Sequence, residues 1–370
     1  MGNEKPVRYV IFGAGAIGTY IGGSLALAGA QVVFLEQPAV VDELRQRGLR
    51  LDLTADPRRA SQQAFVLAPA AFVAAPALDE ALRYGPFDVG LFALKSFDTP
   101  AALEGMRPFA SKLPPFLCLS NGVDNEPAIA SALGPDMVIP ATVTTAIGRR
   151  AAGDIVLERL RGVGIGASHS LSVRLGSAFR QALLNPELFI NEAAMKWSKM
   201  LTNLLANPTS AILDMTAAQV FAHPGLYRLE MDMLRECLAV MGAQRIPVVN
   251  LPGTPARALA LATRLPPWLS RPLLGRAAGS GRGGKMPSFH IDLRSGRGRS
   301  EVEFLHGAVV QAGAKFGVPT PVNKMLTDTL MALTRKEIPL DEFSHQPEKL
   351  LARLGPITTE TQSPQKRMDG

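Results

Sequence analysis

The chain has 370 residues, of which 47% are hydrophobic and 19% charged, and its net charge is +7. This length is enough for two domains with separate cores, and the composition is typical of a globular protein. The basic excess comes with little aromatic interleaving and no nucleic-acid motif, so we expect a pocket for small anions and no nucleic-acid binding. Cys118 and Cys237 stand far apart without metal-ligand spacing. They favour a reducing cytoplasm over a disulfide framework.

The first half of the chain alternates strand-like and helix-like segments. Apolar runs predict strands at 7–12, 31–35, 88–94 and 116–119, a helix at 17–28, a β-rich stretch at 137–146, and one or two closing strands at 155–165. Because buried parallel strands read as continuous apolar runs, this alternation predicts an α/β fold with a Rossmann-like doubly wound sheet over residues 1–178. Glycines interrupt the apolar stretch 7–35, so we predict neither a signal peptide nor a membrane span, and a cytoplasmic protein.

From about residue 178 the pattern changes to helix only. Helical spacing at 188–205, 224–241, 301–316 and 323–335 predicts an all-helical C-terminal domain over 179–354. The insert 251–287 contains several prolines and a glycine cluster, and it is either a partly helical lid or a mobile loop. Its end, 279–286, imitates a phosphate loop but has Met286 in place of the magnesium-binding Ser or Thr, so we interpret it as a flexible basic loop. Residues 355–370 are expected to be disordered.

A glycine-rich segment follows the first predicted strand and opens the first predicted helix. In the dinucleotide-binding fingerprint the first glycine permits the turn, the second lets backbone amides reach the pyrophosphate, and the third allows close packing of helix on strand. The helix N-terminus adds positive potential. We therefore predict a nucleotide site formed by Gly13, Ala14, Gly15, Ala16, Ile17 and Gly18.

The end of the second strand, L-E-Q-P, bears on the choice of cofactor. Glu36 would accept hydrogen bonds from the adenosine ribose hydroxyls and repel a 2′-phosphate. Position 37 is Gln37 rather than an arginine, although Arg45 and Arg47 follow on a helix. This favours NADH over NADPH. The alternative is that Glu36 is a surface acid at a strand end.

Lys199, Asn203 and Asn207 recur at a spacing of four residues. On one helix this spacing places an ammonium and two carboxamides along one face, as in a pocket that polarises a carbonyl and binds a polar substrate. The alternative is a solvated helix face whose Trp197 packs inward. The five histidines show neither metal-pair spacing nor a recognisable Ser-His-Asp arrangement, so we predict no metal site.

With these segments placed, the chain resembles the ketopantoate reductase (2-dehydropantoate 2-reductase) family over residues 7–335. Members reduce the ketone of ketopantoate to pantoate, usually with NADPH, on the pathway to pantothenate and coenzyme A. The resemblance implies a 6-phosphogluconate-dehydrogenase-like pair of domains. Six landmarks occur in family order: G-A-G-A-I-G at 13–18, L-K-S around Lys95, N-G at Asn121, W-S-K-M-L-T-N-L-L-A-N-P at 197–208, P-S-F-H-I-D at 287–292, and R-S-E-V-E-F-L-H-G around Glu301.

The resemblance implies that Lys199 is the general acid. An ammonium with a usual pKa of about 10.4 stays protonated at neutral pH and can protonate the alkoxide that hydride transfer creates. Glu301 would sit near the nicotinamide ribose and this lysine; otherwise it is a helix N-terminal acid. Lys95 would bind the cofactor at the carboxyl end of a strand; otherwise it is a loop cation. The implied substrate-binding residues are Asn121, Asn203, Asn207 and Ser288, with Asn121 also near the cofactor.

Several departures from the family bear on substrate and cofactor. Ser120 and His306 stand where relatives usually have Gln and Asn, and Ala217-Ala218 replaces an Asn-Gly pair. The segment between Ser288 and Glu301 is one residue longer than usual, and the usual NADPH-favouring Arg is missing near position 37. We therefore weigh three functions: a reductase of ketopantoate or a close 2-oxoacid, an opine-type or secondary-metabolite dehydrogenase, and a non-catalytic nucleotide sensor. The oligomeric state stays open, with a homodimer as one option.

Overall fold

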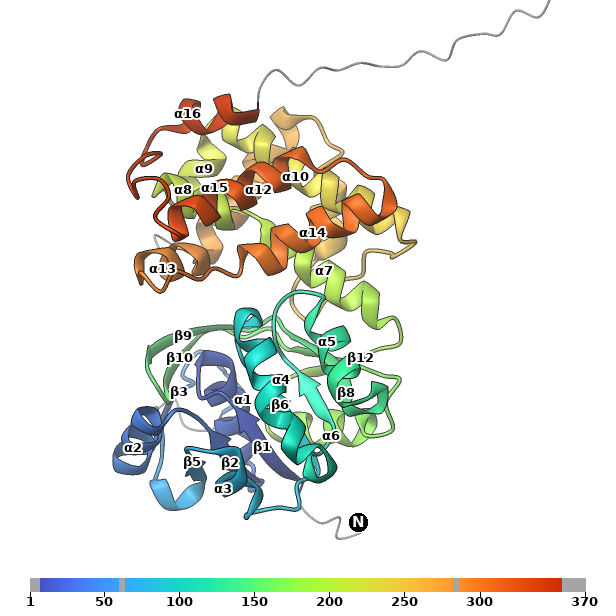
Figure 1. Cartoon of the computed structure of the whole chain (residues 1–370). Coiled ribbons are helices and arrows are strands. Elements are labelled where there is room, and N and C mark those ends of the chain that lie inside the picture. Colours follow the sequence, from blue (N-terminus) through green and yellow to red (C-terminus); the bar gives the residue numbers. More distant parts are fainter. Residues whose placement is uncertain (1–6, 60–63, 283–285, 355–370) are drawn as a thin grey trace, which may run out of the picture.

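The computed structural model describes residues 7–59, 64–282 and 286–354, without the side chains of residues 273 and 276–282. An N-terminal α/β domain and a C-terminal helical domain stand one above the other (Figure 1). The chain passes from the first to the second between β12 (Pro186–Phe189) and α7 (Glu192–Leu204).

The N-terminal domain is built on an eight-stranded sheet with the strand order β12-β11-β8-β7-β6-β1-β2-β5. All neighbouring strands are parallel except β8 and β11. In β1, Tyr9 and Ile11 belong to one apolar cluster, and Val10 and Phe12 to another, so helices cover both faces. This confirms the predicted doubly wound fold. The strands are β1 Arg8–Phe12, β2 Gln31–Leu35, β5 Val73–Ala75, β6 Val89–Phe92, β7 Phe116–Cys118, β8 Val138–Val143, β11 Val163–Gly166 and β12.

Helices of this domain connect the strands. They are α1 Ala16–Leu27, α2 Pro38–Arg47, α3 Leu78–Leu82, α4 Thr99–Met106, α5 Asn125–Leu133 and α6 Ser172–Gln181. Short 3-10 helices are η1 Pro69–Ala71, η2 Ser96–Asp98, η3 Arg107–Lys112 and η4 Pro135–Met137, with η5 Ala352–Leu354 near the end of the second domain.

A second, four-stranded sheet lies beside α1. Its order is β4-β3-β10-β9, with β3 Leu49–Asp52, β4 Phe65–Leu67, β9 Ala146–Ala151 and β10 Asp154–Arg159. The segment 155–165, predicted to close one sheet, is therefore divided between two sheets. The turn between β9 and β10 reaches the glycine-rich segment, where the Gly153 amide donates to the Ala14 carbonyl oxygen at 3.4 Å.

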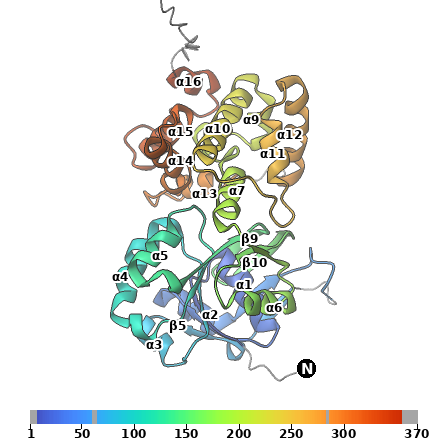
Figure 2. The same cartoon turned by 90° about the vertical axis from the view of Figure 1, so that its right-hand side faces the viewer.

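The helical domain packs around one large apolar core, to which α7, α10, α14 and α15 contribute. In Figure 2, α7 and α13 lie on the side of this domain that faces the sheet domain. Its helices are α7, α8 Asn207–Leu213, α9 Ala217–Ala222, α10 Pro224–Ala243, α11 Ala256–Ala262, α12 Pro267–Arg282, α13 Ser288–Arg294, α14 Val302–Phe316, α15 Pro321–Thr334 and α16 Pro347–Leu351.

Three expectations need correction or fall outside the structure. The change to helix only at residue 178 is wrong, because α6 runs through that position and β12 then pairs with β11 in the main sheet. The insert 251–287 is partly helical, since it forms α11 and α12. Of the predicted basic loop, residues 279–282 are the end of α12, while residues 283–285 and the tail 355–370 lie outside the described residues.

Candidate active site

The glycine-rich turn between β1 and α1 has the geometry of a phosphate cradle. Gly13 has a φ of +101°, which side chains rarely adopt, so the first glycine permits the turn. Gly15 is the N-cap of α1, has no side-chain cap, and a Cβ there would meet no atom within 4 Å. A Cβ on Gly18 would lie 1.8 Å from the Gly13 carbonyl oxygen. Open space above an uncapped helix N-terminus fits a bound pyrophosphate.

Glu36 lies against this turn. Its Oε1 accepts a hydrogen bond from the Ala14 amide at 2.5 Å, and its Oε2 accepts from the Gln37 amide at 3.1 Å. The two nearby arginines are engaged elsewhere: Arg45 donates to the Ala74 carbonyl and pairs with Glu80, and Arg47 pairs with Glu43. The local charge beside the cradle is therefore negative.

Lys95 follows β6 and reaches across to the helical domain. Its Nζ lies 2.8 Å from Asp292 Oδ2 on α13 and 2.7 Å from Glu301 Oε2 at the N-cap of α14. Burial alone would lower the pKa of Lys95, but the two carboxylates outweigh it and raise that pKa. Lys95 and Glu301 are thus brought together as expected for one site. Asp292 belonged to a landmark, but no role was predicted for it.

Asn121 follows the next strand, β7, and also contacts the helical domain. Its Oδ1 accepts from Asn203 Nδ2 on α7 at 3.0 Å. Its carbonyl oxygen accepts from Ser96 Oγ at 2.8 Å and from Asn125 Nδ2 at 2.7 Å, which fixes the loop. The carboxyl ends of β6 and β7 therefore meet the helical domain at the edge where open α/β sheets bind ligands.

Lys199 lies on the face of α7 that points to the sheet domain. Lys196 and Asn203, on either side of it along the helix, both contact that domain. At about 100° per residue, all three side chains fall within roughly 60° of the helix circumference. Trp197 and Leu201 instead enter the helical core. Lys199, which is half-buried, therefore lies on the side of α7 that faces the nucleotide-binding domain.

Asn207 does not continue the helix of Lys199, so the prediction of one helical row holds only for Lys199 and Asn203. Helix α7 ends at Leu204, Ala206 has a φ of 55°, and α8 begins at Asn207. Asn207 Nδ2 donates to the Asn203 carbonyl at 3.2 Å and to Ser288 Oγ at 3.4 Å, and its Oδ1 accepts from the Phe289 amide at 3.2 Å. Asn207 is buried and joins three helix ends, whereas Ser288 is exposed.

Glu230 on α10 holds this break between α7 and α8. It is fully buried, and it accepts from the Ala206 amide at 2.7 Å and from Thr209 Oγ1 at 2.5 Å. A carboxylate at a helix N-terminus is favoured by the helix dipole. No sequence motif pointed to Glu230, because an acid on an amphipathic helix usually faces solvent.

Two further contacts flank Ser288. His290 Nε2 lies 2.7 Å from Asp214 Oδ1, and Arg294 lies 2.9 Å from Asp214 Oδ2. The His290 hydrogen bond is the first cause that lowers the pKa of Asp214, and Arg294 adds to it. Both contacts fasten α13 to the end of α8.

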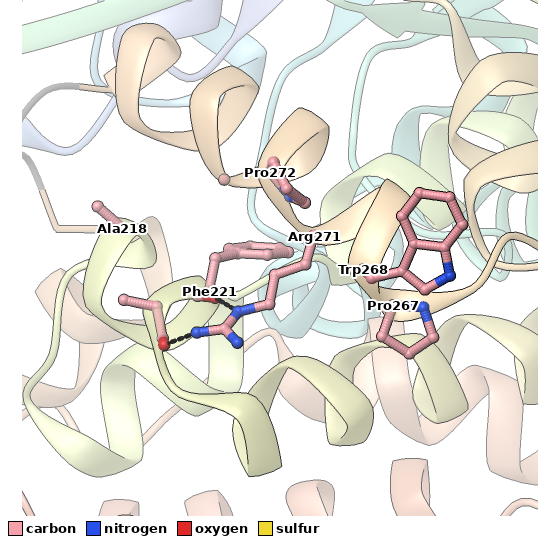
Figure 3. Close-up of a pocket in the computed structure, with 8 residues that line it drawn as sticks. Ala218, Phe221, Pro267, Trp268, Arg271 and Pro272 are labelled. Atoms are coloured by element: carbon pink, nitrogen blue, oxygen red, sulfur yellow. Dashed lines mark hydrogen bonds between the residues drawn. The ribbon is translucent and has the colours of Figure 1, made fainter.

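A separate hollow of about 700 Å³ lies between α9 and α12 (Figure 3). Phe221, Trp268 and Pro272 line it, and Arg271 donates to the carbonyl oxygens of Phe221 and Ala222. None of the predicted site residues lines it. Within residues 7–59, 64–282 and 286–354 there is no cluster of potential metal ligands, and no helix in those ranges is long and apolar enough to cross a membrane.

Two family models match the chain, in the order of its domains. The model described as Ketopantoate reductase PanE/ApbA matches residues 9–169, and Ketopantoate reductase PanE/ApbA C terminal matches residues 191–334. The chain belongs to the ketopantoate reductase family. It is accordingly an NAD(P)H-dependent oxidoreductase that acts on a CH–OH group.

Individual family members align over nearly their whole length. The 2-dehydropantoate 2-reductase of Halobacterium salinarum is 25% identical over 340 residues, covering 89% of this chain and 99% of the relative. That of Mesorhizobium japonicum is 27% identical over 362 residues, covering 89% and 97%. A PanE/ApbA family ketopantoate reductase from Ralstonia eutropha superposes with a TM-score of 0.74 at 27% identity, covering 90% and 99%. D-mandelate dehydrogenase with NADH and anilino(oxo)acetate shares the fold, with a TM-score of 0.70 at 18% identity and coverage of 89% and 99%.

Proposed function

We propose that this enzyme reduces the 2-keto group of ketopantoate to pantoate, as a step of pantothenate biosynthesis; the relatives are named for this reduction. The observation that carries the proposal is the placement of Lys199. It lies on α7 between two residues whose side chains contact the nucleotide-binding domain, so it stands on the side of the helix where a nicotinamide bound to that domain would lie. A reductase that creates an alkoxide needs a proton donor in that position.

When bound, the nicotinamide supplies hydride to C2 of the substrate. The ketone oxygen then takes up negative charge, which the Lys199 ammonium stabilises before it donates its proton, so that C=O becomes CH–OH. Asn203 and the exposed Ser288 hydrogen-bond the substrate hydroxyl and carboxylate. Asn207 supports these two residues and does not itself bind the substrate, because its side-chain amide already donates to Ser288 and to the Asn203 carbonyl at the end of α7. Asn121 and Lys95 stand at the sheet edge, beside the cofactor.

The test follows oxidation of NADH and NADPH with ketopantoate and a panel of 2-oxoacids, one of them aromatic. We expect turnover of ketopantoate by the wild type, and a kcat lowered about 10²–10⁴-fold in Lys199→Ala. Lys324→Ala is the matched control, because Lys324 is exposed on α15. Absence of turnover with every 2-oxoacid would refute the function, and near-normal kcat in Lys199→Ala would refute the mechanism.

We further propose that NADH is the preferred cofactor. Glu36 lies against the cradle and the two nearby arginines are engaged with other groups, so a 2′-phosphate would meet a carboxylate without a cation. Glu36→Gln should raise kcat/KM for NADPH relative to NADH by about tenfold, since one unfavourable charge contact of roughly 1.4 kcal/mol is removed. A clear preference of the wild type for NADPH would contradict this proposal.

A second candidate is an NADH-dependent reductase of a different 2-oxoacid, of opine-type or secondary-metabolite origin. Two observations favour it: the Ala217-Ala218 pair at the start of α9, and a fold shared with D-mandelate dehydrogenase. The same panel separates the two candidates. A kcat/KM at least tenfold higher for another 2-oxoacid than for ketopantoate would select the second.

A further inference from the structure

A buried ion pair joins the two domains beside the proposed proton donor. Lys196 of α7 and Glu126 of α5 have side chains only 7% and 10% exposed, and Lys196 Nζ lies 2.6 Å from Glu126 Oε1. The ammonium also donates to the carbonyl oxygens of Ser120 at 2.9 Å and Ala141 at 3.1 Å. The contact with Glu126 is an ion pair, and the two carbonyl oxygens accept hydrogen bonds from the same ammonium. Burial would lower the pKa of Lys196, but Glu126 outweighs it and raises that pKa, which keeps the group charged.

The two carbonyls that Lys196 binds lie within β8, at Ala141, and shortly after β7, at Ser120. Ser120 directly precedes Asn121, and its Oγ donates to the carbonyl oxygen of Leu94, the residue before Lys95, at 2.7 Å. One ammonium on the helical domain thus binds β8 and the segment after β7, and through Ser120 it is linked to the loop after β6. Asn121 is the loop residue that then pairs with Asn203.

The same ammonium fixes the helix that carries the proton donor. Lys199 follows Lys196 by three residues, about 4.5 Å along the axis of α7 and on the same side. A shift of α7 along the sheet would break the contacts of Lys196 before it moved Lys199 far. Hydride transfer does not require a second lysine at this position. An apolar side chain could be buried there at a smaller desolvation cost than an ammonium.

We infer that Lys196, with Glu126, is a positioning residue that holds Lys199 and the Asn121 loop in register across the domain interface. The expected effect on kcat rests on the proposed function, whereas the expected effect on the Kd for NADH does not depend on the substrate. Misplacement by about 1 Å can reduce turnover by about 10²-fold.

The test replaces both charges together, in Glu126→Leu/Lys196→Met, because an apolar pair of similar size often leaves stability unchanged, whereas one charge left alone does not. We expect a melting temperature close to that of the wild type, a kcat lowered about 10–100-fold with a smaller change in KM, and a Kd for NADH raised about 3–10-fold. The matched control is Asp328→Leu/Lys324→Met, which removes an exposed ion pair of α15 and should leave kcat and Kd unchanged.

A folded double variant with wild-type kcat and wild-type Kd overturns the inference. If the wild type reduces no 2-oxoacid, the proposed function fails, and the NADH Kd still decides the role of Lys196. If the double variant does not fold, Glu126→Gln decides, since it keeps the ammonium and an oxygen acceptor. If the pair positions the site, Glu126→Gln should lower kcat and raise the Kd for NADH by at least about threefold, and wild-type values of both would overturn the inference.

Discussion

His306 should make the helical domain lose stability in mild acid. It is fully buried on α14, and its Nδ1 lies 3.0 Å from Asn323 Oδ1. Asn323 Nδ2 donates to Met233 and Glu236, so Oδ1 faces the imidazole and Nδ1 carries the proton of a neutral ring. Burial outweighs this hydrogen bond and lowers the pKa of His306 from 6.5 to about 3.

The size of the effect follows from proton linkage. The unfolded chain protonates His306 near pH 6.5 and the folded chain only near pH 3, so the stabilising contribution is complete above 6.5 and is lost as pH falls toward 3. Between pH 7.5 and pH 5.0 the loss amounts to about 2 kcal/mol, since each pH unit below 6.5 costs about 1.4 kcal/mol.

Tryptophan fluorescence during urea unfolding measures this domain alone, because Trp197 and Trp268, the two tryptophans of the chain, both lie in it. The decisive comparison is the change in unfolding free energy between pH 7.5 and 5.0. It should be about 2 kcal/mol smaller in His306→Asn, which introduces the residue common in the family. His345→Asn, at an exposed histidine with a φ of 53°, should behave as the wild type does. Equal losses in the wild type and His306→Asn would refute the reasoning.

Three other substitutions probe the cradle, the helix break and the domain contact. Gly18→Ala places a Cβ 1.8 Å from the Gly13 carbonyl oxygen, so NADH binding followed by fluorescence should weaken more than tenfold; unchanged binding would contradict the cradle. Glu230→Ala leaves the buried Thr209 hydroxyl and a backbone amide without their acceptor. It should lower the unfolding free energy of the helical domain by about 2–4 kcal/mol in urea titrations, and a loss below about 1 kcal/mol would count against this role. Lys95→Met removes a partly exposed cation whose pKa is raised. The wild type should therefore be more stable than the variant near neutral pH, and this advantage should disappear as pH rises above 10.5, measured by thermal unfolding.

The sequence was informative where a local pattern and its physical cause coincide. The spacing of Gly13, Gly15 and Gly18 predicted the cradle, because each glycine meets a local steric demand. The positions of Lys95 and Asn121 after apolar runs predicted side chains at one edge of the sheet. The fold class is confirmed, whereas the roles of these residues stay predictions.

Other features depend on contacts that no local pattern contains. The apolar period of Leu204 and Leu205 continues through the point where α7 ends, and only Pro208, which favours the first turn of a helix, signalled that a new helix begins at Asn207. Strand β12 has four residues, two of them exposed, so it lacks the apolar run by which the other strands were found. The pairing of Lys95 with Asp292 joins residues 197 positions apart, and such a contact exists only after the domains have docked.

The short passage from β12 to α7 limits how the two domains can move. Only Ile190 and Asn191 separate the last residue of the sheet from the first residue of the helix that carries Lys199. Any rotation of the domains thus pivots at the β12 edge, four strand positions from β6, or roughly 19 Å at about 4.8 Å per strand. A turn of about 10° around that point would displace the Lys95 contact by roughly 3 Å. Rotation of the domains apart would therefore stretch the contact of Lys95 with Glu301 somewhat more than the contacts of α7 with Ser120 and Asn121, which follow β7 and lie one strand nearer to the pivot.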